Sequence, residues 1–150
     1  MTNSSRAQSR SVARLGAVQA LYQWDMEATG VEKLLHEFHE HRLGAVIEDA
    51  HYAAAETSFF DDLVSGTIAR TGEIDAHITA RLAEGWNLDR LDKPMKACLR
   101  VGTYELLARA DVPVGSVISE YVDVAKAFYD VKEAGFVNGI LDSVAKAVRT

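Results

Sequence analysis

The sequence has little of what several classes of protein depend on. Its single cysteine, Cys98, excludes an internal disulfide, and its apolar, helix-patterned surroundings indicate a small core residue rather than a nucleophile. No apolar run approaches the roughly 20 residues that cross a bilayer. The first residues also lack the hydrophobic stretch of a secretory signal. We therefore expect a cytoplasmic protein with no membrane partner.

Signals for β-strands are absent too. Nowhere do apolar and polar residues alternate with a period of two, and the chain has neither an internal repeat nor a low-complexity tract. Apolar residues instead recur every three or four positions, so the sequence predicts an all-α fold of six or seven short helices. With 150 residues and 48% hydrophobic content, the chain is long enough for one core or for two small subdomains packed together.

Apolar spacing and capping signals place the helices. Capping-box patterns occur at Thr29 with Glu32 and at Ser58 with Asp61. The predicted helices run from Ser11 to Met26, Val31 to Phe38, Phe60 to Ile68, Ile74 to about Gly85, Pro94 to Leu106 and Ser116 to Phe128, with a last one around Phe136 to Val148. The segment 39–56 is expected to be helix extension or loop.

The last predicted helix contains two residues that disfavour a helix. Gly139 costs on the order of 1 kcal/mol relative to Ala, and Asn138 prefers caps because its amide competes for backbone groups. We expect Gly139 to let another backbone approach closely and Asn138 to hydrogen-bond a neighbouring loop or a partner. The alternative is a frayed helix start that tolerates a glycine.

Residues able to support catalysis or bind a metal form no known pattern. His36, His39 and His41 lie among glutamates, but the zincin motif needs histidines four apart and His39 follows His36 by three. The chain has no nucleophile elbow and no glycine-rich phosphate loop. We therefore expect no enzyme, no metal and no cofactor.

The charge is unevenly distributed. The net charge is −6, yet residues 1–24 contain Arg6, Arg10 and Arg14 and no acidic residue. Arginines four apart follow one face of a helix, and guanidinium groups pair with phosphates and stack on bases. This exposed basic stripe is predicted to bind single-stranded nucleic acid. The alternative is a ragged basic terminus without a ligand.

Three strings carry a resemblance to a known family. FVNGILD at 136–142, AVQALYQW at 17–24 and LRVGTYEL at 99–106 together resemble the NusB family of bacterial transcription antitermination factors. The likeness covers nearly the whole chain, except for about 36–56. It implies a single domain over 1–150 with two helical subdomains, approximately 1–83 and 84–150.

The resemblance also implies a function. Members of this family bind the boxA segment of leader RNA together with NusE, a small-subunit ribosomal protein, in the RNA polymerase complex that promotes rRNA operon transcription. The resemblance assigns Arg6, Arg10 and Arg14 to the RNA-binding site and Lys132 to a further phosphate contact.

Other matched positions concern the protein partner. Tyr22 and Asp89 match positions that meet NusE, although the apolar stripe around Tyr22 also fits a core residue. Met95 stands where many family members have an acidic residue, which leaves the geometry of the NusE contact open.

Two other functions stay open at this point. One is a NusB-like RNA-binding module of the kind fused to rRNA cytosine methyltransferases, although we expect no catalytic domain after Thr150. The other is a helical interaction scaffold that does not bind RNA. The chain is either a monomer or a homodimer, since an apolar helix face does not identify what covers it.

Overall fold

A computed structural model describes residues 3–40 and 50–149, with side chains described for 8–40 and 57–149. These residues form seven α-helices and no strand, which confirms the all-α prediction. The helices are α1 (Asn3–Glu27), α2 (Val31–Phe38), α4 (Ala50–Ala69), α5 (Thr71–Thr79), α6 (Lys93–Ala108), α7 (Val114–Phe128) and α8 (Val131–Val148), and a short 3-10 helix, η2 (Leu88–Arg90), precedes α6.

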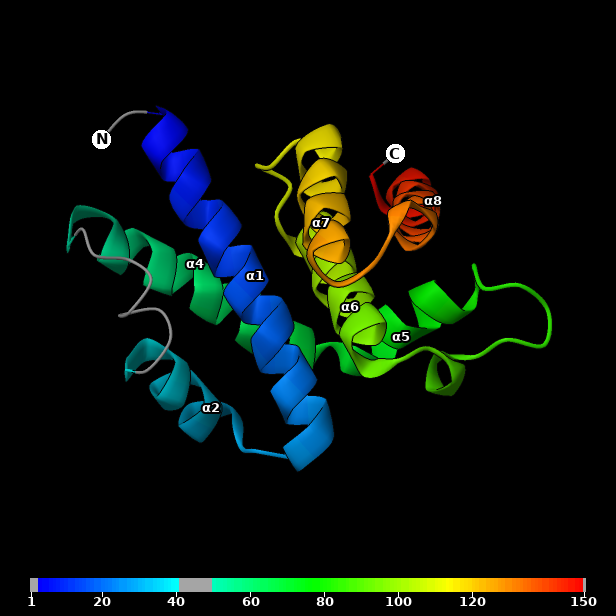
Figure 1. The fold of residues 1–150 in the computed structure, drawn as a ribbon, viewed down its shortest axis with the longest axis horizontal. Coiled ribbons are helices and arrows are strands. Elements are labelled where there is room, and N and C mark those ends of the chain that lie inside the picture. Colours follow the sequence, from blue (N-terminus) through cyan, green and yellow to red (C-terminus); the bar gives the residue numbers. More distant parts are fainter. Residues whose placement is uncertain (1–2, 41–49, 150) are drawn as a thin grey trace.

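Helix α6 lies at the centre of the molecule. It packs against α1, α4, α5, α7 and α8, and every residue from Met95 to Leu106 is buried. In Figure 1, α1 crosses α4 on one side of α6, while α7 and α8 lie on the other. One apolar core runs through both halves of the chain, so the boundary near residue 83 stays a prediction.

Several helices begin earlier than their apolar patterns indicate. The chain is helical from Asn3 rather than Ser11, and α4 begins at Ala50, so the predicted capping box at Ser58 is wrong. Alanine needs no packing to favour a helix, and an alanine-rich stretch extends α4 beyond its apolar face. Amino-terminal ends without an apolar face are therefore hard to locate from periodicity.

The start of α6 is fixed by its cap. Asp92 accepts a hydrogen bond from the backbone N–H of Met95 at 3.2 Å, and Pro94 occupies the first turn as predicted. The hydroxyl of Tyr129, just after α7, also donates to Asp92. The carboxylate therefore joins the amino end of α6 to the junction between α7 and α8.

The carboxyl end of α6 is held by an arginine from the end of the chain. Arg149 donates hydrogen bonds to the carbonyl oxygens of Leu106 at 2.6 Å, Arg109 at 2.8 Å and Val112 at 3.0 Å. The carbonyl of Leu106 is among the acceptors that the end of α6 leaves unpaired, whereas Arg109 and Val112 belong to the turn that follows. The end of α8 is thereby fixed to the turn between α6 and α7.

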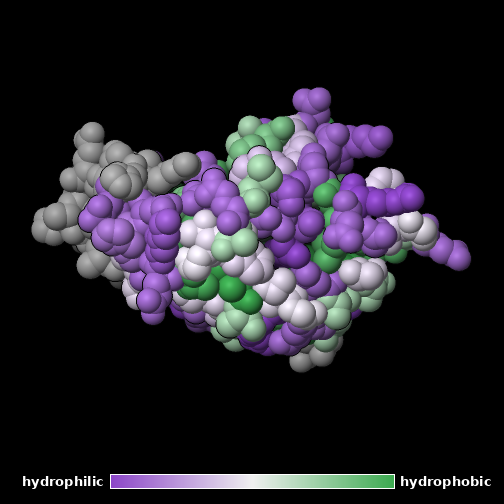
Figure 2. Space-filling view, turned by 90° about the horizontal axis from the view of Figure 1, so that it is seen from below, coloured by the Kyte–Doolittle hydropathy of each residue, from purple (hydrophilic) through white to green (hydrophobic). Residues whose placement is uncertain are grey.

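The face of the molecule seen from below is mainly hydrophilic. Figure 2, which shows the molecule from below, has several hydrophobic areas separated by hydrophilic ones. No helix in the described ranges is both long enough and apolar enough to span a membrane.

No described segment packs closely on Gly139, so the expected close approach within the chain is wrong, whereas a hydrogen bond from Asn138 to a partner stays a prediction. Because α8 begins at Val131, both residues lie in its interior, and both are exposed. Nothing lies within 4 Å of where a Cβ of Gly139 would be. The buried face of α8 is formed instead by the Val137 and Leu141 stripe, so the glycine faces solvent.

Close approach occurs at two other glycines. A Cβ on Gly66 would collide with the ring of Tyr104, whose hydroxyl donates to Asp62 of α4 at 2.7 Å. A Cβ on Gly102 would lie 3.0 Å from Leu141. These glycines let α6 lie close to α4 and to α8.

We predict opposite effects of alanine at Gly66 and at Gly139. Gly66→Ala displaces the Tyr104 ring and should destabilise the fold by about 1–3 kcal/mol. Gly139→Ala should stabilise it by up to about 1 kcal/mol, because the space is open and alanine favours a helix. Thermal melting checks both. A drop in melting temperature for Gly139→Ala would mean that this position is packed after all.

Candidate functional site

The three arginines predicted to form one exposed stripe do not share an environment. Arg6 lies in α1, but its side chain is outside the described residues. Arg14 is 4% exposed, and its Nε and Nη2 donate to the two carboxylate oxygens of Glu105 at 2.9 Å and 2.7 Å. The prediction of an exposed Arg14 is therefore wrong. Its partner lies 91 residues away, on α6, where local spacing cannot reveal it.

Glu105 is the centre of a buried polar network. It also accepts the hydroxyl of Tyr121 at 2.8 Å, and Glu120 lies 3.6 Å from the Arg14 guanidinium and accepts from Ser11 at 2.8 Å. Burial lowers the pKa of Arg14, but Glu105 raises it by more, so the net pKa is raised. Burial and Glu105 raise the pKa of Tyr121 well above its usual value. The network holds α1, α6 and α7 together, and Arg14 is a structural cation.

Arg10 has the accessible position that Arg14 lacks. It is half-buried, and its guanidinium lies 4.5 Å from the centre of the Phe59 ring. No carboxylate among the described residues pairs with it. Contact with an aromatic face holds a guanidinium in place without neutralising it. Arg10 is therefore an oriented cation whose charge is available to a ligand.

Lys132 lies far from Arg10. It is exposed in the first turn of α8, and no described carboxylate pairs with it. Phe59, beneath Arg10, also contacts Arg109 at the carboxyl end of α6, whereas Lys132 shares a cavity with Met95 at the amino end. The 16 residues of α6 span about 24 Å. A ligand that contacts both cations must therefore be extended.

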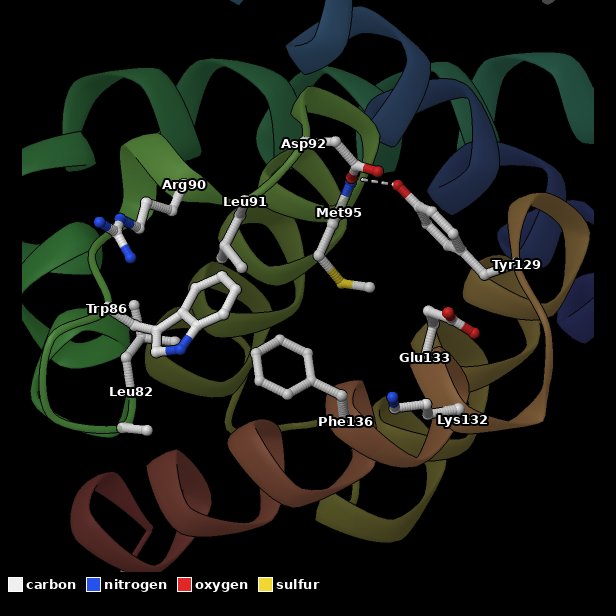
Figure 3. Close-up of a pocket in the computed structure, with 11 residues that line it drawn as sticks. Leu82, Trp86, Arg90, Leu91, Asp92, Met95, Tyr129, Lys132, Glu133 and Phe136 are labelled. Atoms are coloured by element: carbon white, nitrogen blue, oxygen red, sulfur yellow. Dashed lines mark hydrogen bonds between the residues drawn. The ribbon is translucent and has the colours of Figure 1, made fainter.

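A cleft of about 570 Å³ lies between the segment after α5, the amino end of α6 and the start of α8. In Figure 3, Trp86 and Phe136 line one part of it, the Met95 side chain points into it, and Tyr129 closes the other end. Lys132 lies at the α8 edge. We call this cavity the cleft.

A smaller hollow of about 240 Å³ lies beside it, between α1, α6 and α7. We call it the groove. Tyr22, Pro94 and Phe128 line it, and Tyr22 is 38% exposed, so this side chain belongs to the surface rather than to the core. Asp89 is exposed in η2, whereas Met95 is 5% exposed. The two candidate partner residues therefore lie on either side of the amino end of α6.

An ion-pair cluster fixes the end of α1 beside the groove. Asp25 lies 3.3 Å from Lys93, 3.5 Å from Lys96 and 3.9 Å from Arg100, all on α6. Burial raises the pKa of Asp25, but the hydrogen bond from Lys93 and the neighbouring cations lower it by more. The carboxylate is therefore held charged, and it positions Tyr22 one turn earlier in α1.

Two of the histidines lie beside carboxylates. His39 Nε2 lies 2.6 Å from Asp61, and His36 lies 3.5 Å from Glu40. His41 is outside the described residues. Among the residues that the structure describes, no three potential ligands gather where they could hold a metal.

Aromatic residues are the part of the site that the sequence pattern does not indicate. Phe59, which supports Arg10, reads as an ordinary core position, and Trp86 lies in a stretch without periodicity. Trp86 is assigned to a surface site by its exposure, and Phe59, which is 3% exposed, only by its contact with Arg10. The one sequence signal for such a site is a tryptophan in a polar connector.

The fold is shared with known proteins. The NusB family model matches residues 11–146. The chain belongs to the NusB family. A transcription antitermination protein NusB from Sphingopyxis alaskensis is 68% identical over 146 residues, which are 97% of this chain and 98% of the relative.

Solved structures agree with this assignment. T. maritima NusB is similar with a TM-score of 0.77 and 31% identity, over 91% of this chain and 90% of that one. A crystal structure of NusB and NusE in complex with dsRNA gives a TM-score of 0.76 and 29% identity, over 93% and 98% of the two chains. The helical arrangement around α6 is thus the fold of the NusB family.

We predict that Arg14→Ala destabilises the protein by about 3–5 kcal/mol, because Glu105 is left buried without its cationic partner. Arg10→Ala, the matched control, should change stability by no more than about 1 kcal/mol, which is the size of one cation–π contact. Chemical denaturation of both variants measures the difference. Equal stability of the two would show that Glu105 does not depend on Arg14.

Proposed function

We propose that this member of the NusB family is an RNA-binding transcription antitermination factor. It binds boxA-type leader RNA together with the ribosomal protein NusE, within the antitermination complex of RNA polymerase, and so promotes transcription of rRNA operons. The observation that carries this proposal is Arg10, a cation with no carboxylate partner among the described residues, held on an aromatic ring in the amino-terminal part of α1. The relatives named as antitermination proteins and the NusB–NusE complex with dsRNA support it.

The RNA contacts are assigned to Arg10, Arg6 and Lys132. Arg10 and Lys132 have no acidic partner among the described residues, and Arg6 lies one turn before Arg10 in α1. Arg14, in contrast, contributes to RNA binding only indirectly, because it fixes the position of α1. A distance of about 24 Å along α6 corresponds to several nucleotides of extended strand, which suits a single-stranded segment rather than one phosphate.

The NusE contact is assigned to Tyr22 and Asp89. Tyr22 presents an amphipathic ring at the groove, and Asp89 presents an exposed charge in η2. Aromatic residues at a hollow are typical anchors of protein interfaces. RNA and protein would then meet different faces of one rigid core.

This role needs neither catalysis nor a cofactor, and it places the protein in the cytoplasm, where bacterial transcription takes place. The competing function is a scaffold that binds NusE without RNA. The unpaired Arg10 favours the RNA-binding factor. A titration of boxA-type RNA by fluorescence anisotropy, with and without NusE, separates the two, since only the factor binds RNA and binds it more tightly with NusE.

We predict that Arg10→Ala and Lys132→Ala each weaken RNA binding and reduce its dependence on salt. For a single strand, each neutralised phosphate contributes about −0.7 to the slope of log K against log salt. The double variant should therefore flatten the slope by about 1.4. Lys146→Ala is the control, because Lys146 is exposed but pairs with Asp142 at 3.0 Å. A double variant with the slope of the unmodified protein would place the RNA elsewhere.

For the protein partner, we predict that Tyr22→Ala raises the dissociation constant of NusE and that Asp89→Lys mainly slows association. Tyr22 is an anchor at a hollow, whereas Asp89 is a rim charge that acts by steering. Calorimetry and stopped-flow binding measure the two effects. Unchanged NusE binding in both folded variants would exclude this face.

A further inference from the structure

A second accessible cation lies at the Phe59 ring beside Arg10. The guanidinium of Arg109 is 5.2 Å from the ring centre, and that of Arg10 is 4.5 Å from it. The two groups are therefore neighbours, although one comes from the carboxyl end of α6 and the other from α1. In Figure 1 the turn from α6 to α7 lies at the same end of the molecule as the start of α1. The proposed RNA contact at Arg10 thus has a cation beside it that has no assigned role.

The ion pairs of Arg109 are looser than those of Arg14. Arg14 donates hydrogen bonds of 2.9 Å and 2.7 Å to Glu105, whose side chain is fully buried. Arg109 instead lies 3.3 Å from Asp62 and 3.3 Å from Asp111, and the side chains of these two carboxylates are 34% and 60% exposed. Its Nε makes no hydrogen bond to the described part of the chain. Ion pairs with such exposed partners contribute little to stability, so Arg109 can exchange a partner at small cost.

Both carboxylates tolerate the departure of the Arg109 guanidinium. Asp62 also accepts a hydrogen bond from the Tyr104 hydroxyl at 2.7 Å, so it keeps a partner. Asp111 is exposed, and water solvates its charge. The backbone of Arg109 stays fixed, because its carbonyl oxygen accepts a hydrogen bond from Arg149 at 2.8 Å. The exchange therefore requires only a side-chain movement.

A phosphate is a well-matched replacement for Asp111. Phosphate and carboxylate oxygens both accept paired hydrogen bonds from the planar guanidinium group. Asp111 makes only long contacts with Arg109, at 3.3 Å and 3.4 Å. An RNA strand that contacts Arg10 brings its neighbouring phosphates to the same ring, because both guanidinium carbons lie within 5.2 Å of the ring centre.

We infer that Arg109 is a further phosphate-binding residue of the proposed RNA site, and that Asp111 competes with the phosphate for its guanidinium. This inference rests on the proposed function. In the free protein, Asp111 holds the Arg109 side chain against the turn between α6 and α7. In the complex, the guanidinium turns to the strand that Arg10 contacts. Asp111 thereby limits the affinity for RNA.

The test compares Asp111→Asn with Arg109→Gln in titrations of boxA-type RNA by fluorescence anisotropy at several salt concentrations. Asp111→Asn removes the competitor and should tighten RNA binding about two- to fivefold, the range of an exposed ion pair. Arg109→Gln should weaken binding and flatten the salt slope by about 0.7, the contribution of one phosphate. Arg109→Lys keeps the charge and should keep the slope. In the Arg109→Gln background, Asp111→Asn should have no effect.

Glu73→Gln is the matched control. It removes one exposed carboxylate from an ion pair with Arg70 at 2.9 Å, so it changes the net charge by the same amount as Asp111→Asn. Arg70 follows the end of α4, about three helical turns beyond Phe59. The affinity of Glu73→Gln for RNA should therefore equal that of the unmodified protein.

Each other outcome overturns the inference. Weaker RNA binding by Asp111→Asn, or an unchanged salt slope in Arg109→Gln, contradicts it directly. An equal gain from Asp111→Asn with and without Arg109 would make the gain a general effect of charge. A slope that flattens in Arg10→Ala but not in Arg109→Gln would leave the proposed function standing. No RNA binding by the unmodified protein would overturn the inference and the proposed function together.

Melting curves verify that the variants are folded. If Arg109→Gln does not fold, the comparison of Asp111→Asn with Glu73→Gln decides, since only the first should bind RNA more tightly.

Discussion

The ion pair between Arg14 and Glu105 is the interaction on which the arrangement of the helices depends. Both groups are almost completely buried, and a buried charge is tolerated only when it is paired and hydrogen-bonded. Glu105 satisfies Arg14 of α1 and Tyr121 of α7 at once, so the direction of α1 is fixed relative to α6 and α7. Arg10 lies one turn earlier on α1, and its position over Phe59 follows from that direction.

Helix α6 separates two kinds of surface because both of its ends are fixed. At the carboxyl end, Arg149 holds the turn toward α7, and Arg10 lies near Arg109 around the Phe59 ring. At the amino end, Asp92 joins α6 to Tyr129, beside the apolar hollows. A rigid helix with a cation near one end and apolar hollows at the other suits a protein that binds an extended RNA and a protein partner together. Such binding requires little rearrangement, which lowers its entropic cost.

The sequence predicts the helices well because their apolar stripes are local, and it predicts the core role of Cys98, whose pKa burial raises to about 12. Prediction from the sequence fails where the residue that a side chain contacts lies far away in the chain. Arg10 and Arg14 belong to the same series of arginines four residues apart. Only the placement of α6 makes Arg14 structural and leaves Arg10 accessible. The prediction for Gly139 is wrong because the buried stripe of α8 runs through Val137 and Leu141, which leaves Gly139 on the exposed face. The groove brings Tyr22 together with Pro94 and Phe128, and the cleft brings Trp86 together with Phe136, which no local pattern indicates.

RNA and NusE are proposed to occupy different faces of one core organised by α6. Hydrogen–deuterium exchange of the protein alone, with boxA-type RNA, with NusE and with both tests this arrangement. We expect RNA to slow exchange in the amino-terminal turns of α1 and the first turn of α8, and NusE to slow it in the second half of α1, in η2 and at the start of α6. Protection by both ligands over the same segments, or by RNA at the Tyr22 face alone, would contradict it.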